Sequence, residues 1–553
     1  MVQSKAAALC SGAPVWSLER RTMAGDLSHM DSPGNWTSEQ QRWTDYYTER
    51  LASQLRQVAA FVSARRDNPD ALRRHFESCL ALFEATANRP DLSALWLDLA
   101  DALHPWPLRW GFWSPWLDVL QTAADKAAGL GRPALRARYL GNIATLLLET
   151  AQADAALSRA SEALDEAGRA GDGYALALAG SRAAGALSLL GRYEEARALQ
   201  GEVRRQLDTL PADLSGVPNA SARALLDMEE MDLAREDGQL AEAITIGERL
   251  IATLEATAGV DPHDLATAYR RRATILWVAG RYADAAGDLT RSAALFRAVG
   301  DPLAAVFSEG NLGVVYFSMG RFQLAETVKA RAIRSAEELN ANWWLVRDLG
   351  ELCGIYMYTG QLERALTYCH RHVELARRLG DERQLALARD NRGVTLMLLG
   401  RYDEARPDIQ DSLRYFQDGG LIENTILATL DMALFLRATG ESERAAALAA
   451  ECAALASGLD FPILHVLTTR CLALFKPPLE QGRLLREALA LAEAHGRRMD
   501  VAGCLFSLAG LEADAAERGR LYNQAAAMLQ AMEAEAWLVG HSPADPPLLP
   551  MFY

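Results

Sequence analysis

Apolar residues recur along most of this chain at intervals of three and four, and glycines interrupt the pattern at regular distances. The apolar spacing places hydrophobic side chains on one face of successive helices. Turn glycines at positions 280, 320, 360, 400 and 440 lie 40 residues apart, with further copies of the turn at Gly191 and Gly238 and a degenerate copy at Ala151. A fixed period of this size predicts stacked helical hairpins, each made of a helix A, a glycine turn and a helix B.

Two kinds of short segment separate the predicted helices. The turn inside a hairpin reads Gly-Arg-Tyr or Gly-Arg-Phe in its clearest copies, and the junction between hairpins reads Gly-Asp at residues 171–172, 300–301 and 380–381. Glycine accepts the left-handed conformation that ends a helix, and the aspartate caps the next helix. We expect the arginine of each turn to interact with the carboxyl end of helix A. A Trp-Trp pair replaces the junction at residues 343–344, and we expect one ring to be packed and the other exposed.

Small and large residues recur at fixed positions within the hairpins. An alanine follows the turn glycine by five residues, as at Ala196, Ala285 and Ala405, and a bulky residue precedes the glycine by four. Small residues allow two helices to approach closely, and the aromatic residue two positions after the glycine fills the adjacent space. These residues are therefore assigned to packing.

The strongest copies resemble a known repeat family. Residues 311–316 read Asn-Leu-Gly-Val-Val-Tyr and are followed by Gly320, Phe322 and Ala325, which resembles the tetratricopeptide repeat (TPR) consensus. The resemblance covers residues 133–530 and is strongest between 265 and 450. HEAT and armadillo arrays share the 40-residue period but lack this turn. The resemblance implies an all-α, TPR-like helix-turn-helix solenoid that winds as a right-handed superhelix.

Arrays with this period also resemble the sensor parts of bacterial signal-transduction ATPases of the maltose-regulon activator type. The tryptophans at positions 96, 106, 110, 113 and 116 resemble the segment that connects such a sensor to its nucleotide switch. The sequence contains no GxxxxGK[ST] motif that would cradle a triphosphate. The resemblance therefore implies the sensor array without the ATPase domain.

The pattern divides the chain into four parts. Residues 1–37 are expected to be a flexible tail, and residues 38–132 a helical N-terminal cap region whose first helix begins with a capping box at Ser38. Residues 133–535 form the repeat array, and residues 536–553 an extended C-terminal tail. We consider two destinations for the apolar end of this tail, a neighbouring molecule or the concave groove of the array itself.

Composition and charge exclude several classes of function. The net charge of −15 argues against direct nucleic-acid binding, which requires a basic surface. No run of about 18 apolar residues occurs, so no membrane-spanning helix is expected. The seven cysteines form no CxxC pair, which favours buried, reduced thiols in a cytoplasmic protein without a metal or another cofactor.

No arrangement of residues indicates catalysis. The densest group of potential ligands is Thr-Tyr-Cys-His-Arg-His at residues 367–372, but His370 and His372 are two positions apart on a helix and face away from each other. We interpret them as solvated or packed helix residues, and we expect no catalytic site and no enzymatic activity.

The surface of the A helices is the candidate binding site. If the TPR alignment holds, positions five, six and twelve of each hairpin, counting the turn glycine as fifteen, face a concave groove. These positions, with Arg347 near them, comprise Arg182, Arg235, Arg270, Arg271, Trp277, Asn311, Phe317, Met357, Asp390, Asn391, Met397 and Arg437. Arginines bind carboxylates in a fork, and Trp, Phe and Met give adaptable apolar contact. The alternative is that these arginines are ordinary solvated side chains.

The sequence therefore predicts a non-catalytic scaffold or adaptor that binds a partner protein or peptide in the groove. A partner segment with acidic groups is one candidate ligand for the arginines of the groove. The alternative is a sensor module that binds a small effector or signalling peptide and regulates a transcriptional or signalling partner.

Overall fold

The computed structural model describes residues 36–65, 68–150, 152–210, 219–459, 461–549 and 551. Throughout these residues the secondary structure is helical, with no β-strand beyond one isolated bridge between Ser542 and Asp545. This confirms the all-α class and the repeated helical hairpins expected from the sequence. The predicted flexible tail at residues 1–37 lies outside the described residues except for its last two positions.

Five α-helices and one short 3₁₀-helix precede the array. They are α2 (Trp36–Ser63), α3 (Pro69–Thr86), η2 (Pro90–Leu92), α4 (Ser93–Leu103), α5 (Trp106–Arg109) and α6 (Trp113–Gly129). The expected start of the first helix was wrong, because α2 begins at Trp36 and Ser38 lies inside it. Nothing in the sequence between Trp36 and Ser38 disfavours a helix, so the capping-box pattern did not mark the boundary.

Ten helical hairpins follow within the described residues. The A helices are α7 (Pro133–Glu149), α9 (Gly173–Leu189), α11 (Asn219–Glu236), α13 (Pro262–Val278), α15 (Pro302–Ser318), α17 (Asn342–Tyr358), α19 (Glu382–Leu398), α21 (Ile422–Ala438), α23 (Pro462–Ala473) and α25 (Arg498–Leu511). The B helices are α8 (Ala153–Ala170), α10 (Tyr193–Thr209), α12 (Leu240–Ala256), α14 (Tyr282–Ala298), α16 (Phe322–Glu338), α18 (Leu362–Leu379), α20 (Tyr402–Asp418), α22 (Ser442–Ser457), α24 (Pro478–Ala494) and α26 (Ala515–Ala531). A last 3₁₀-helix, η3 (Glu535–Leu538), follows α26.

The structure confirms the predicted roles of the turn glycines and of the junction aspartates. The turn glycines have positive φ, for example +73° at Gly280 and +72° at Gly400. The carboxylates of Asp172, Asp301 and Asp381 accept hydrogen bonds from backbone amides of the next helix A at 2.9–3.0 Å. Where no glycine is present at the 340 junction, Asn340 adopts the left-handed conformation with a φ of 54°. Asparagine tolerates this conformation better than most residues, so the period continues.

For three of the four turn arginines the predicted role was wrong. Arg192, Arg281 and Arg401 pair with acidic residues three positions later, in the first turn of helix B, at 2.7 Å in each case. An acid in the first turn of a helix is already favoured by the helix dipole, and the arginine side chain reaches it more readily than the end of helix A.

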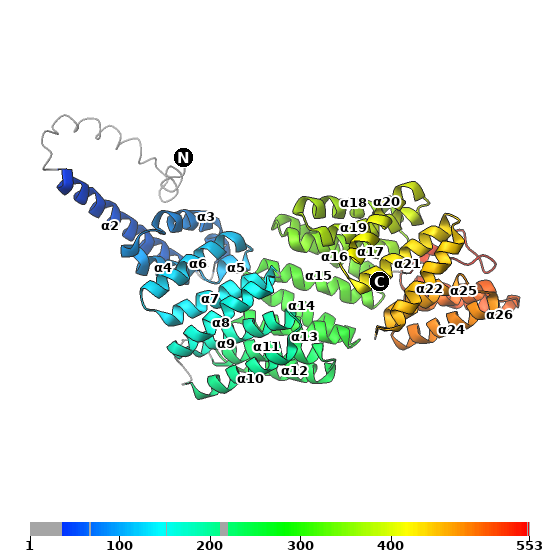
Figure 1. Cartoon of the computed structure of the whole chain (residues 1–553), viewed down its shortest axis with the longest axis horizontal. Helices are drawn as coiled ribbons and strands as arrows, with labels where there is room; N and C mark the ends of the chain where they lie inside the picture. The colour runs from blue at the N-terminus through cyan, green and yellow to red at the C-terminus, as the bar shows by residue number, and fades with distance from the viewer. Residues whose placement is uncertain are drawn as a thin grey trace, which may run out of the picture. The chain divides into compact units, whose positions relative to one another are not determined.

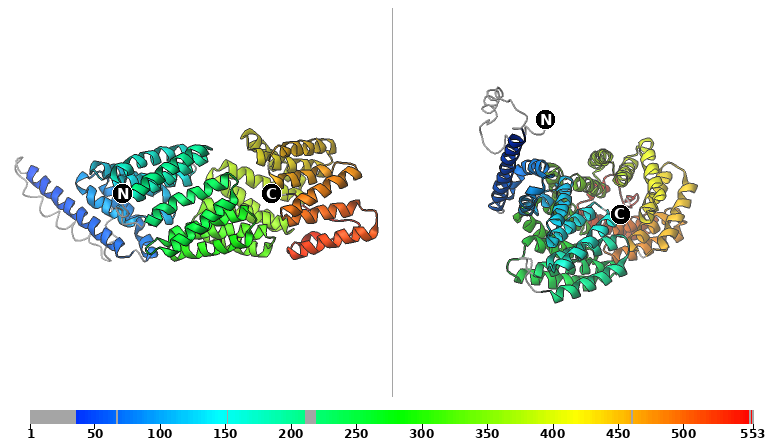
Figure 2. Two further views of the ribbon diagram at one scale, coloured as in Figure 1. Left: turned by 90° about the horizontal axis from the view of Figure 1, so that it is seen from below. Right: turned by 60° about the vertical axis from the view of Figure 1, so that its left-hand side comes forward.

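The chain forms two compact units. Unit 1 comprises residues 1–279 and 291–305, and unit 2 comprises residues 280–290 and 306–553. Within each unit, helices stack in chain order, as the colour gradient of Figures 1 and 2 shows. In most repeats the A helices of successive hairpins pack against one another, while the B helix packs mainly against the A helices of its own and the next repeat. The A helices therefore line the inner side of each curved stack, called the inner face below.

In unit 1 the tryptophans of the N-terminal helices are part of a buried core. The same helices also contact later hairpins of the array. Trp96, Trp106, Trp110 and Trp116 are buried in one cluster with residues of α7, α8 and α9. Arg109 forms an ion pair with Asp261 at 2.5 Å, at the start of α13. Its Nη1 also donates a hydrogen bond to the carbonyl oxygen of Val299 at 3.5 Å. The cap helices thus contact hairpins more than 150 residues later in the sequence.

In unit 2 the end of the array also contacts hairpins that lie far earlier in the sequence. The indole Nε1 of Trp537 in η3 donates a hydrogen bond to the carbonyl oxygen of Tyr358 at 3.0 Å, at the end of α17. Ala536 and Trp537 also lie against Gly360, and Met532 lies against Gly320. The end of the array therefore packs on the turns of hairpins that precede it by about 180 residues.

Candidate functional site

The inner face of unit 1 carries a network of opposite charges. Arg271 on α13 forms ion pairs with Asp232 and, at 3.2 Å, with Glu229, both on α11. Arg182 on α9 lies 3.9 Å from the same glutamate and donates a hydrogen bond from Nε to Thr145 Oγ1 at 2.8 Å. The nearby carboxylates hold the pKa of Arg271 above its usual value despite its burial. Two of the predicted arginines are therefore neutralised by acids of the array itself.

The other predicted residues of unit 1 make contacts of several kinds. Arg270 lies over the ring of Phe296, with its guanidinium carbon 5.8 Å from the ring centroid. Burial lowers the pKa of Arg270. Trp277 is half-buried at the end of α13. Arg235 pairs with the adjacent Glu236.

In unit 2, Arg347 connects several predicted positions. Its guanidinium lies over the rings of Phe307 and Trp344 at 4.9 and 5.3 Å, and it donates a hydrogen bond to Asn311 Oδ1 at 3.3 Å. The Phe307 and Trp344 rings are stacked, with centroids 4.2 Å apart. Trp343 is 52% exposed. The structure confirms that one ring of the Trp-Trp pair packs and the other is exposed.

The apolar positions predicted to face the groove are mostly core residues. Met357 and Met397 are buried in the main hydrophobic cluster of unit 2, and Phe317 packs against that cluster with its ring at right angles to Tyr358. Arg437 is exposed near the end of α21. The two methionines are therefore not available on a surface, because neighbouring helices cover them.

Two carboxylates on successive A helices form the most unusual electrostatic feature of unit 2. Asp390 on α19 accepts a hydrogen bond from Ser412 Oγ at 2.8 Å, and burial raises its pKa to about 6. Asp431 on α21 is 6% exposed, and its Oδ1 has no hydrogen-bond partner in the part of the chain that the structure describes. Burial and the charge of Asp390 raise the pKa of Asp431. Asn391, beside Asp390, is half-buried.

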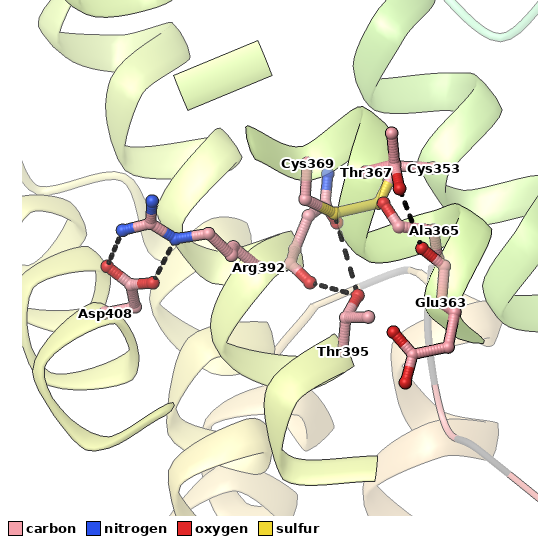
Figure 3. The surroundings of a disulfide bond; sticks show 9 residues. Cys353, Glu363, Ala365, Thr367, Cys369, Arg392, Thr395 and Asp408 are labelled. Carbon is pink, nitrogen blue, oxygen red and sulfur yellow. Dashed lines mark hydrogen bonds and ion pairs between the residues drawn. A yellow bond between two sulfur atoms is a disulfide. The ribbon is translucent and has the colours of Figure 1, made fainter. Parts of the chain in front are cut away.

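The group at residues 367–372 consists of solvated and packed helix residues, with His370 exposed and His372 buried, but it contains a bond that the sequence did not indicate. Cys369 on α18 forms a disulfide with Cys353 on α17, with Cα atoms 6.0 Å apart (Figure 3). The expectation of reduced thiols was therefore wrong for this pair, whereas four further described cysteines are buried and form no disulfide. Rules based on close spacing miss the pair because the hairpin brings together residues 16 positions apart. His372 is buried against Gly350, and burial lowers its pKa to about 4.

A segment near the C-terminal end lies across A helices of unit 2. Residues 546–549 and Met551, called the docked segment, have no helical structure. Pro546 lies against Gly510 at the end of α25, and Arg470 Nη2 on α23 donates a hydrogen bond to the carbonyl oxygen of Leu549 at 3.3 Å. Met551 belongs to the cluster formed by α21, α22 and α23. The tail therefore contacts α21, α22, α23 and α25 of its own chain.

The docked segment has the side-chain alternation of an extended chain. Pro547, Leu549 and Met551 are buried, whereas Leu548 is 40% exposed. Alternate side chains of an extended backbone point to opposite sides. The segment therefore presents every second side chain to the helices, which is the mode in which an extended peptide binds to a surface.

The free energies that hold the docked segment nearly cancel. Burying the Leu549 and Met551 side chains contributes about 1.5–3 kcal/mol each, whereas fixing the backbone of each residue costs about 1–2 kcal/mol. One hydrogen bond to a charged donor adds about 1.5–3 kcal/mol. The docked and released states consequently differ by a small free energy.

Arg470 is the residue beneath the segment that sequence reasoning missed. It is buried and forms an ion pair with Asp500 at 2.5 Å. Arg497 also pairs with Asp500, at 2.7 Å. The Nε of Arg470 has no hydrogen-bond partner among the described residues. The 40-residue spacing is not kept after residue 470, so these positions could not be aligned with the other repeats. No sequence pattern therefore pointed to them.

The geometry defines a solenoid of helical hairpins whose inner faces carry polar residues and an extended segment. Residues 264–338 and 348–418 match the tetratricopeptide repeat family model. The chain therefore contains tetratricopeptide repeats, as the resemblance implied. A search of curated protein sequences finds no significant match.

The solved structures that match this chain share little sequence with it. The apo form of RapI is 15% identical with a TM-score of 0.48, covering 65% of this chain and 97% of that one. A Rap protein complexed with competence and sporulation factor is 15% identical with a TM-score of 0.47, covering 64% and 96%. A signal transduction ATPase with numerous domains and a tetratricopeptide repeat sensor, from Pyrococcus horikoshii, is 14% identical with a TM-score of 0.42, covering 62% and 54%. The ligand of this chain has to be inferred from its own residues.

Two kinds of feature are absent from the described ranges. None of their helices has both the length and the apolar character needed to cross a membrane. No group of three or more His, Cys, Asp or Glu side chains in these ranges is arranged to hold a metal ion.

Proposed function

We propose that the protein binds an extended segment of a partner protein, or a peptide, on the inner face of unit 2 and catalyses no reaction on it. The docked segment supports this proposal most directly, because the same helices already hold an extended chain through buried alternate side chains and a carbonyl contact to Arg470. Tetratricopeptide repeats supply the rigid helical surface that such binding requires.

Asp390 and Asp431 indicate part of the ligand chemistry. A buried carboxylate oxygen without a donor destabilises the free protein, and such a cost is typical of positions kept for binding. Ligand groups that suit these carboxylates are donors, such as backbone N–H groups or the side chains of lysine and arginine. The ligand proposed for this end of the inner face is therefore a segment with a basic residue.

The partner with acidic groups that the sequence predicted is not assigned to a site in unit 1. Arg271 is already held by Asp232 and Glu229, and Arg182 lies 3.9 Å from Glu229. Acids of the array itself therefore occupy these two arginines.

A selection from a random peptide library tests the main proposal. Peptides selected on the full chain are expected to contain a basic residue, and Asp431→Asn is expected to weaken them about tenfold, the loss of one charge-assisted hydrogen bond. Asp403→Asn, at the exposed start of α20, is the matched control and should leave binding unchanged. The proposal fails if no peptide is selected, or if none responds to substitutions on the inner face.

A further inference from the structure

We infer that the docked segment is an internal competitor that occupies the ligand surface of unit 2, and that the external ligand is an extended segment with apolar residues at alternate positions that displaces it. This inference rests on the proposed function and adds the regulation of the site and the chemistry of the partner. It follows from the contacts of the segment and from the small difference in free energy between its docked and released states.

The contacts of the docked segment are those of a ligand. It crosses α25 at Gly510 and α23 at Arg470, and it ends with Met551 in the cluster of α21, α22 and α23. These contacts use side chains that any extended chain with the same alternation could supply. The only backbone hydrogen bond recorded between residues 546–549 or Met551 and the helices is the one from Arg470.

Arg470 is better suited to an exchangeable ligand than to a permanent one. Its guanidinium is buried, yet the contact to Leu549 is long at 3.3 Å and the Nε has no partner among the described residues. A guanidinium forms its strongest contacts when two of its N–H groups donate to the same partner. An incoming segment that offers Arg470 a second acceptor gains a contact that the docked segment does not provide.

Tethering explains how a weakly held segment can still block the surface. A segment attached to the same chain acts at an effective concentration in the millimolar range, so an external ligand must bind more tightly than the segment does. The resting protein is therefore closed to weak apolar segments, and it opens to partners that also bind elsewhere on the inner face, for example at Asp431.

The experiment uses a fluorescein-labelled synthetic peptide with the sequence of residues 543–553 as the probe, and measures binding by fluorescence anisotropy. Three proteins are compared with the full chain: a chain that ends at Asp545, the full-length double variant Leu549→Asp/Met551→Asp, and the control Leu548→Asp. The control alters the exposed position of the same segment. Circular dichroism verifies that each variant keeps its helical content.

We expect the truncated chain and the double variant to bind the probe at least about tenfold more tightly than the full chain, because the tethered competitor has been removed. The control should behave like the full chain. Equal affinity of the probe for all four proteins overturns the inference, while the proposed function stands because the probe is bound. Absence of probe binding to every protein also overturns the inference. The proposed function is judged separately, by whether the library selection yields peptides sensitive to Asp431→Asn.

Discussion

The ammonium group of Lys329 lies 2.8 Å from Oδ1 of Asp348, and both side chains are buried. Lys329 is on α16, and Asp348 is on the next A helix, α17. Lys329 also forms an ion pair with Glu351. The alkyl stem of the lysine lies against Gly313, where any larger side chain would clash. A buried charge pair thus joins two consecutive hairpins of unit 2.

Replacing Lys329 by methionine should destabilise unit 2 by up to about 3–5 kcal/mol, because it leaves the buried Asp348 with only the longer contact of 3.7 Å to Arg347. Combining it with Asp348→Asn should recover part of this loss, since the uncompensated charge is then removed. Urea unfolding followed by circular dichroism measures both effects. Lys476→Met is the matched control, because the Lys476–Glu480 pair is partly exposed and longer at 3.7 Å, and should change stability by less than about 1 kcal/mol.

His372 should make stability depend on pH between about 4 and 6.5. Burial lowers the pKa of His372 from 6.5 to about 4, so the unfolded chain binds the proton more tightly than the folded chain. Stability is therefore complete above the unfolded pKa and falls as the pH decreases toward the folded pKa, by about 3 kcal/mol in total. His372→Gln should flatten the unfolding free energy measured over this range. His495→Gln, at an exposed position, should keep the slope of the parent chain. An unchanged slope in His372→Gln would show that other groups cause it.

Asp431 should reduce stability at neutral pH. Because burial raises the pKa of Asp431, the folded chain holds its proton more tightly than the unfolded chain does. Stability contributed by the protonated group is therefore lost as the pH rises above about 4, the ordinary value for aspartate. Asp431→Asn should increase the free energy of unfolding at pH 7.5 by about 1–3 kcal/mol, and the gain should disappear near pH 4. Lower stability of this variant at pH 7.5 would contradict the absence of a hydrogen-bond donor to Oδ1 of Asp431 among the described residues.

Two glycines with the same backbone conformation should respond differently to alanine. Gly300 and Gly400 have φ values of +71° and +72°. A Cβ at position 300 would lie 2.3 Å from Cγ of Pro69 in the cap, whereas a Cβ at position 400 meets open space. Gly400→Ala should cost only the backbone strain of about 1–2 kcal/mol. Gly300→Ala should cost more and loosen the contact of the cap with the array. Hydrogen exchange of residues 69–86 measures that loosening, and equal exchange in both variants would argue against the contact.

The sequence alone determined the class of fold and the identity of its repeats. The 40-residue period is a local property, because left-handed glycines and capping aspartates act within a few residues, and the helices begin at Pro262, Pro302 and Asn342 as the period requires. The resemblance to tetratricopeptide repeats rested on the same local residues. The exposed and packed rings of Trp343 and Trp344 could likewise be deduced from their adjacency on one helix.

The tertiary structure decided which of those residues meet, because that depends on side chains far apart in sequence. The predicted groove positions were chosen by register within one repeat, and register does not reveal that Asp232 neutralises Arg271 or that neighbouring helices bury Met357. The pairing of Cys353 with Cys369 and the contact of Arg109 with Asp261 depend on how hairpins fold back. The hydrogen bond from Arg470 to the carbonyl oxygen of Leu549 depends on the curvature that several repeats produce together. Curvature is a collective result of helix packing, so only the folded molecule shows where the last residues lie.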